Sequence, residues 1–217
     1  MLKKFSAIPL SILTLMTSGC FHSPAPYVPA DAAVSVQGET ITECQNTMSC
    51  LQILIMYGSH ICAHAALRLE YPTGKSLFWD PAGGYGKAGS VFAERDRDVI
   101  HRNAPTLNEY IFFRTEIETA AAEIFEWRIE AQQADKLYNI LSRGTDDAAP
   151  EGKFSPQGAG LFCSSHVSEF LQRFAGDLLT VEKVFYPHAL AKQLYTQSPD
   201  RVIIINFDDY ISIREIQ

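Results

Sequence analysis

A predicted β-hairpin in the first third of the chain constrains the fold more than any other feature. Residues 61–71 form an apolar-rich run that leads through Pro72-Thr73-Gly74 into a second run, residues 75–80. A three-residue connection that ends in glycine is typical of a type I turn followed by a left-handed bulge residue, which joins two antiparallel strands. The chain is therefore expected to build an antiparallel sheet around this hairpin.

The register of this hairpin predicts that two polar side chains share one face of the sheet. If Tyr71 pairs with Lys75, Ala66 lies opposite Asp80. Because side chains alternate along a strand, His64 shares the face of Ala66, and Asp80 falls on that face too. A slip of one residue would move Asp80 to the other face. The hairpin therefore predicts that His64 and Asp80 are neighbours.

A second segment combines an amphipathic helix with a cysteine at its start. The glycine-rich residues 157–160 lead into Cys163. Apolar residues then recur at the i, i+3, i+4, i+7 spacing of a helix: Val167, Phe170, Leu171 and Phe174. At a helix N-terminus, unpaired N–H groups and the helix dipole stabilise a thiolate, which lowers the pKa of the thiol. This position suits a nucleophile, although a cysteine without a partner base is as readily a small buried apolar residue.

A cysteine nucleophile needs a base, and the base needs a third group that orients it. His64 is the candidate base and Asp80 the candidate orienting group. Three further histidines are available: His60, His166 and His188. His166 ranks second, because it follows Cys163 on the same helix, where no second element would hold it.

Patterns upstream and downstream of the cysteine predict the remaining elements of an α+β fold. Residues 51–57 are expected as a buried strand or a short helix, which periodicity alone does not separate. A helix is expected from Pro187 through Leu194, with proline in the first turn. Residues 201–207 are expected as a closing strand.

The segment between the hairpin and the cysteine is expected to hold a strand and then a long helix. Residues 109–115 have strand character. Thr115 and Glu118 have the spacing of a capping box, and the apolar stripe that follows predicts a helix that ends near Arg143. Residues 146–160 are expected as a loop.

The first twenty residues predict a secretory signal that ends at a modified cysteine. Lys3 and Lys4 precede an apolar run from residue 5 to 16, which is too short to span a membrane. The small residues before Cys20 resemble a bacterial lipobox, although Thr17 stands where leucine is usual. This likeness implies that Cys20 becomes a lipidated first residue.

Three regions follow from this interpretation. Residues 1–19 are the signal peptide, 20–40 the lipid anchor and a flexible tether, and 41–217 the folded domain. The formal net charge is −7 at pH 7, and removal of the leader's two lysines leaves about −9. Such a surface repels phosphate backbones, which argues against a nucleic-acid partner.

Four cysteines remain in an exported chain, which can keep disulfides. They are Cys44, Cys50, Cys62 and Cys163. The favoured pair is Cys44 with Cys50, and Cys62 is the chief competitor. Their spacing does not match a zinc site.

Two of these segments resemble a known family. The first is the hairpin at residues 59–69 (Ser-His-Ile-Cys-Ala-His-Ala-Ala-Leu-Arg-Leu) and 77–83 (Leu-Phe-Trp-Asp-Pro-Ala-Gly). It is similar to the hairpin of NlpC-type papain-like hydrolases, in which a histidine opens one strand and a polar residue lies on the next. The second, residues 161–165 (Leu-Phe-Cys-Ser-Ser), resembles the nucleophile helix of the circularly permuted branch, which includes YaeF- and YiiX-like lipoproteins and, distantly, lecithin retinol acyltransferase. The histidine precedes the cysteine, as in that branch, and the resemblance covers residues 50–207.

The resemblance implies a permuted papain-like fold, with an antiparallel sheet packed against the nucleophile helix and a long helix. It implies that Cys163 attacks a carbonyl carbon, that His64 accepts and returns the proton, and that Asp80 orients His64. Glu70 is the alternative third member, because the hairpin turn is longer than is usual in the family. Ser165 departs from the acidic residue that often follows Phe-Cys-Ser. Backbone N–H groups at the helix start would hold the oxyanion, and neither a metal nor an organic cofactor is implied.

The implied chemistry is hydrolysis or transfer at an amide or ester. For a lipid-anchored protein of the bacterial envelope, at the outer membrane and facing the periplasm, the first expectation is a cysteine peptidase or amidase that acts on peptidoglycan peptides. A lipid acyl hydrolase or transferase is the second. A catalytically inactive lipoprotein that binds peptide or lipid is a further alternative. The expected partners are the substrate and the membrane that holds the anchor.

Overall fold

The computed structural model describes most of the chain after residue 46 and one short strand before it. The described residues are 34–37, 47–58, 63–83, 85, 98–100, 104–116, 119–157, 162–206 and 212–216. The predicted signal peptide, Cys20 and most of the predicted tether lie outside them. Among the helices within these ranges, none is long and apolar enough to cross a membrane.

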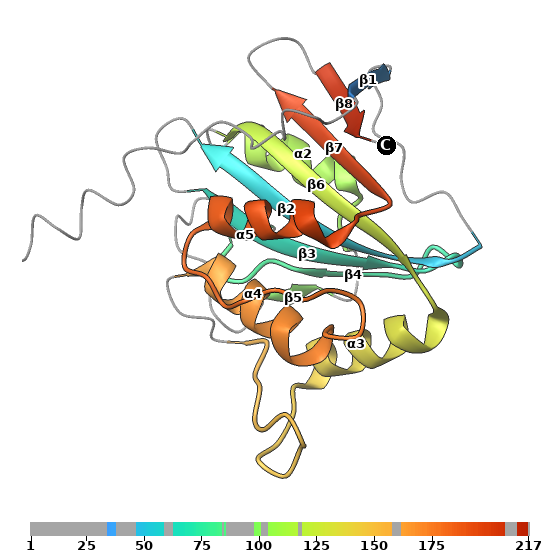
Figure 1. Cartoon of the computed structure of the whole chain (residues 1–217), viewed down its shortest axis with the longest axis vertical. Coiled ribbons are helices and arrows are strands. Elements are labelled where there is room, and N and C mark those ends of the chain that lie inside the picture. The colour runs from blue at the N-terminus through green and yellow to red at the C-terminus, as the bar shows by residue number, and fades with distance from the viewer. Residues whose placement is uncertain are drawn as a thin grey trace, which may run out of the picture.

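One antiparallel sheet forms the centre of the molecule (Figure 1). Its strands are β1 (Val34–Gln37), β2 (Ser49–Gly58), β3 (His64–Glu70), β4 (Ser76–Trp79), β5 (Val99–Ile100), β6 (Thr119–Ile129), β7 (Arg201–Asn206) and β8 (Ser212–Ile216). They lie in the order β1-β8-β7-β6-β2-β3-β4-β5, and each neighbouring pair is antiparallel. β1 belongs to the segment expected as a tether, so part of that segment is an edge strand of the sheet.

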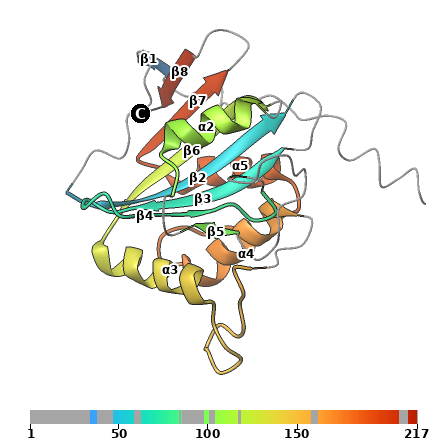
Figure 2. The same ribbon diagram turned by 180° about the vertical axis from the view of Figure 1, so that it is seen from behind.

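Helices cover both faces of the sheet, as the two opposite views show (Figures 1 and 2). The helices are α2 (Leu107–Glu116), α3 (Ala131–Arg143), α4 (Cys163–Phe174) and α5 (Pro187–Leu194), followed by the short 3₁₀ helix η2 (Tyr195–Gln197). α3, α4 and α5 share one apolar core with the sheet, and α2 packs on the opposite face. The α+β class expected from the sequence is confirmed.

The alternation of side chains along the strands divides the core into two layers. In β4, Trp79 packs toward α4 and its ring lies 5.4 Å from that of Phe170, whereas Phe78 points to the other face, 4.3 Å from Tyr110 of α2. All four side chains are fully buried. Each such side chain contributes roughly 1.5–3 kcal/mol through burial, so the sheet holds helices firmly on both sides.

The hairpin has the predicted register. The Tyr71 N–H donates to the Lys75 carbonyl over 2.9 Å, and Leu67 lies opposite Trp79. Gly74 ends the turn with a φ of 77°, in the left-handed region that glycine adopts without strain. The residues of the turn therefore determine the register of this hairpin. Of the two alternatives for residues 51–57, the strand is confirmed by β2, and the closing strand expected at 201–207 is confirmed over residues 201–206 by β7.

The prediction of a long helix from Thr115 to Arg143 was wrong in its first half, which is the strand β6, whereas its second half is the helix α3, which ends at Arg143 as expected. β6 lies between β2 and β7, and both of its faces are buried. Phe125 and Trp127 belong to the core on the side of α3–α5, and Ile124 to the core beneath α2. A central strand has apolar residues on both faces, so it lacks the alternation that would distinguish it from a helix.

The prediction of a strand at 109–115 was also wrong, since these residues lie in α2. Thr106 and Glu109 form a reciprocal cap at its start: the Thr106 N–H donates to Glu109 Oε2 (2.8 Å), and the Glu109 N–H donates to Thr106 Oγ1 (3.2 Å). Aromatic and β-branched residues favour strands, but this capping box starts a helix. The buried side of α2 follows the helical i, i+3, i+4, i+7 spacing: Leu107, Tyr110, Ile111 and Arg114.

Cys50 lies in β2 and forms a disulfide. Its predicted partner Cys44 and the competitor Cys62 both lie outside the described residues. The pairing of Cys50 with Cys44 therefore stays a prediction.

Candidate active site

The cysteine singled out in the sequence is the first residue of α4. The preceding residue, Phe162, is the N-cap and has an extended backbone. The N-terminus of α4 packs on the start of β3, where the Ala65 N–H donates to Cys163 Sγ over 3.3 Å. The Ser164 N–H also bonds to the sulfur. Cys163 is a free thiol, 8% exposed, that lies between the N-terminus of α4 and the start of β3.

His64 is the first residue of β3. It directly precedes Ala65, whose N–H contacts the sulfur. Its Nε2 lies 2.6 Å from Asp80 Oδ1. The imidazole also forms a side-chain hydrogen bond with Cys163, and because Nε2 is used by Asp80, Nδ1 is the nitrogen left for the sulfur. The three predicted residues therefore meet in one continuous chain, from the sulfur through the imidazole to the carboxylate.

Asp80 follows β4, and its carboxylate is held from several sides. Oδ1 also accepts from the Tyr110 hydroxyl of α2 over 2.7 Å, and Oδ2 accepts from the Tyr85 N–H over 3.3 Å. Gly83 approaches the carboxylate so closely that a Cβ at this position would lie 1.9 Å from Oδ2. Only a residue without a side chain fits there, so the turn after β4 is shaped around this carboxylate.

The pKa shifts of Cys163, His64 and Asp80 all favour the charged form of each group. Burial raises the pKa of the Cys163 thiol, but the charge and hydrogen bond of His64 and the N–H bonds to the sulfur outweigh it, so the pKa is lowered. Burial lowers the pKa of His64, but the charges of Cys163 and Asp80 outweigh it and raise the pKa to about 9. Burial raises the pKa of Asp80, but His64, Arg114 and Tyr110 together lower it.

These opposite shifts favour a thiolate beside a protonated imidazole. A thiolate is the reactive form of cysteine, and an imidazolium beside it can donate a proton to a leaving group. The arrangement is that of a nucleophile, an acid–base group and an orienting carboxylate.

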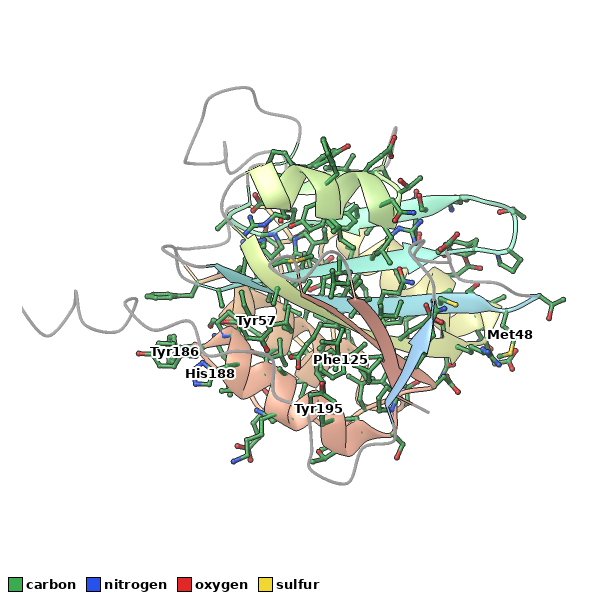
Figure 3. All side chains as sticks on the ribbon, turned by 90° about the horizontal axis from the view of Figure 1, so that it is seen from above. Met48, Tyr57, Phe125, Tyr186, His188 and Tyr195 are labelled. Atoms are coloured by element: carbon green, nitrogen blue, oxygen red, sulfur yellow. The ribbon has the colours of Figure 1, made fainter. Side chains whose placement is uncertain are left out.

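The other candidates that the structure describes, Glu70, His166 and His188, do not join this arrangement. Glu70, the alternative third member, lies at the far end of β3 and pairs with Arg68 Nη1 over 2.5 Å. His166 is half-buried; burial lowers its pKa, and the charges that act on it are those of Glu169 and Lys183. His188 stacks on Tyr186 with ring centres 5.6 Å apart (Figure 3), and His60 lies outside the described residues.

Two residues near the site were missed in the sequence, and both lie on α2. Tyr110 bonds to Asp80, and Arg114, one turn further along, is buried and adds a positive charge that acts on Asp80 and His64. Two features of the sequence could have predicted this helix: the capping-box pair Thr106 and Glu109, and the i, i+3, i+4, i+7 spacing of its buried residues.

An exposed aromatic surface lies beside the nucleophile. Phe162 is 52% exposed, Phe185 60% and Tyr186 52%. The rings of Phe162 and Phe185 meet edge to face, 5.6 Å apart. The Ser164 hydroxyl donates to the Phe185 carbonyl, so the segment that carries Phe185 and Tyr186 is fixed to the first turn of α4.

Within the described ranges, no cluster of three or more histidine, cysteine or acidic side chains could hold a metal ion. Comparisons of the chain with protein-family models, with curated proteins and with solved structures found no match.

Proposed function

We propose that the protein is a cysteine hydrolase of the bacterial cell envelope that cleaves amide bonds, with peptidoglycan peptides as its substrate class. The observation that carries the proposal is the chain of contacts from Cys163 through His64 to Asp80, with 2.6 Å between His64 Nε2 and Asp80 Oδ1. All three groups are buried, and they come from the start of α4, the start of β3 and the residue that follows β4.

In the proposed reaction, the Cys163 thiolate attacks the carbonyl carbon of the amide. The oxyanion that forms accepts hydrogen bonds from N–H groups at the start of α4, including that of Cys163. The His64 imidazolium donates its proton to the leaving amine, and a thioester to Cys163 remains. His64 then removes a proton from water, the water cleaves the thioester, and the thiolate–imidazolium pair is restored.

The fold and location belong to the same proposal. An antiparallel sheet with the histidine at the start of one strand, and a later helix that begins at the cysteine and packs on that strand, agrees with a circularly permuted papain-like architecture. The lipobox-like leader favours an outer-membrane lipoprotein that faces the periplasm.

The exposed aromatic surface favours a second candidate, a lipid acyl hydrolase or transferase. Phe162, Phe185 and Tyr186 stand next to the nucleophile, and large exposed apolar groups beside a reactive thiol suit an acyl chain. The same nucleophile and acid–base group would then act on an ester.

The test compares two substrates with one set of variants. Purified peptidoglycan fragments and phospholipid vesicles are incubated with wild type, Cys163→Ala, His64→Ala and His166→Ala, and products are measured by mass spectrometry. Cleaved peptide supports the first candidate and released fatty acid the second.

Cys163→Ala and His64→Ala are expected to lose activity by at least about 100-fold, since acid–base catalysis alone contributes that much. His166→Ala is the matched control, because His166 lies on the same helix and its charge neighbours are Glu169 and Lys183, and it is expected to retain activity. Cleavage that survives in Cys163→Ala, or no product from either substrate with wild type, would contradict the proposal.

A further inference from the structure

The carboxylate of Asp80 is held by side chains from two different elements, β3 and α2. It contacts His64, which reaches the thiol at the start of α4. Tyr110, on the helix that packs against the face opposite α4, donates its hydroxyl to the same oxygen, Oδ1, over 2.7 Å. Tyr110 is fully buried.

We propose that Tyr110 is a positioning residue that fixes the Asp80 carboxylate and through it the His64 imidazole. The inference deepens the proposed function and rests on it. Tyr110 does not contact the sulfur in any described hydrogen bond; its contact is with the carboxylate that orients the base.

The direction of this hydrogen bond follows from the ionisation of the two groups. Burial and the nearby Asp80 charge raise the pKa of Tyr110 well above its usual value, whereas the pKa of Asp80 is lowered. The phenol therefore keeps its proton and donates it to a carboxylate. Such charge-assisted bonds are stronger than neutral ones.

The bond also removes the rotational freedom of the carboxylate. Oδ1 accepts from His64 and Tyr110, and Oδ2 accepts from the Tyr85 N–H. The carboxylate cannot turn about its Cβ–Cγ bond without breaking at least one of these contacts. His64 is thereby held at the angle that directs its other nitrogen toward Cys163.

A neutral donor has a specific electrostatic advantage at this position. The charged groups that face the pair are Arg114 from α2 and Cys163 from α4. Arg114 lowers the pKa of Asp80 but also lowers that of His64, so it opposes the imidazolium. The Tyr110 hydroxyl stabilises the carboxylate without placing a positive charge beside the imidazolium. It therefore sustains both charges together.

The test measures the pH dependence of the alkylation of Cys163 by iodoacetamide in the full chain. The peptide that trypsin releases, residues 154–173, contains Cys163 as its single cysteine, so mass spectrometry resolves its rate. In Tyr110→Phe the midpoint of thiolate formation is expected to rise by about one pH unit, and the rate at pH 6 to fall about tenfold.

Tyr195→Phe is the matched control. The Tyr195 hydroxyl donates to buried Glu123 over 2.8 Å, a bond of the same kind on the α5 side of the sheet (Figure 3). This variant is expected to leave the alkylation profile unchanged. A Tyr110→Phe profile that coincides with those of wild type and Tyr195→Phe would overturn the inference.

A second substitution covers the case in which Tyr110→Phe fails to fold. Fluorotyrosine at position 110 keeps the ring and the hydroxyl but is a stronger donor, so it is expected to lower the midpoint of thiolate formation. An unchanged midpoint would overturn the inference.

Failure of the inference and failure of the proposed function give different results. If wild-type Cys163 titrates as an ordinary thiol, near the usual value of about 8.5, the proposed function fails. If wild type has the lowered midpoint but neither substitution of Tyr110 moves it, only the positioning role fails.

Discussion

The side chains of Cys163, His64 and Asp80 depend on one another for their charges. Each is buried, and burial alone would keep each of them neutral. The sulfur and the carboxylate together raise the pKa of the imidazole between them, and the imidazolium lowers the pKa of both anions. Loss of any member is therefore expected to change the protonation of the other two.

Gly83→Ala tests how tightly the carboxylate is held. The added Cβ would lie 1.9 Å from Asp80 Oδ2, so the carboxylate must move away from His64 or Tyr110. The variant is expected to fold, with alkylation of Cys163 at pH 6 reduced about tenfold through the loss of one charge-assisted bond.

Gly176→Ala is the control for Gly83→Ala. A Cβ at Gly176 would meet its nearest neighbour at 3.7 Å, an ordinary contact. Equal alkylation rates in the two variants would show that the close approach of Gly83 does not position Asp80.

At the scale of residues, the sequence could predict that Cys163, His64 and Asp80 meet. It could not predict the contact of Tyr110 with Asp80. Cys163 followed from the pattern of its own helix, and His64 and Asp80 followed from the hairpin register. Tyr110 comes from an element whose position depends on the whole sheet. No local spacing in the sequence connects it to Asp80, since the two are brought together only when α2 packs on the face opposite α4.

At the scale of elements, the predictions held where the signal was local. Gly74 adopts the left-handed backbone that ends the turn 72–74, and Pro187 occupies the first turn of α5, where proline is favoured. Both preferences can be read from the residues themselves. β6 was misread because its conformation is set by its neighbours: pairing with β2 and β7 overrides the helix propensity of its alanines and glutamates.

The helix α2 was misread because its start signal lies upstream of the residues taken for a strand. Thr106→Ala tests that explanation, since it removes the hydroxyl that accepts from the Glu109 N–H. Loss of such a cap costs about 1 kcal/mol of the free energy of unfolding, measured by urea denaturation.

Thr106→Ser is the control for the cap, because it retains the hydroxyl. It is expected to have nearly the stability of wild type. A Thr106→Ala variant as stable as Thr106→Ser would contradict a capping role for this residue.

At the scale of the whole molecule, the site lies where both layers of the core meet one end of the sheet. β3 and β4 supply His64 and Asp80, α4 supplies the thiol from one face, and α2 supplies Tyr110 from the other. Folding must therefore complete both layers before the three charges are stabilised, which couples the ionisation of the site to global stability.

This coupling has a defined pH window. The pKa of Asp80 is lowered in the folded state, so its contribution is present above its unfolded value of 3.8 and is lost as the pH falls through the folded value. The pKa of His64 is raised from 6.5 to about 9, so its contribution is complete below 6.5 and is lost as the pH rises through 9.

Asp80→Asn tests the pH range over which the ionisation of Asp80 and His64 stabilises the fold. The substitution removes the carboxylate charge that favours the imidazolium, so its cost in the free energy of unfolding is expected to be larger at pH 6 than at pH 10, where His64 is neutral. Urea denaturation of wild type and variant at both pH values measures this difference. A cost that is equal at the two pH values would contradict the coupling.

The central claim is that Cys163 and His64 form a thiolate–imidazolium pair, and the titration of His64 tests it most directly. ¹⁵N NMR of histidine-labelled protein, assigned with His64→Gln, follows the protonation of its ring. We predict that His64 titrates at a pH of about 9 in wild type and at a clearly lower pH in Cys163→Ala, because the sulfur supplies the largest of the charges that favour the imidazolium. A His64 that titrates near its usual 6.5 in both proteins would contradict the claim.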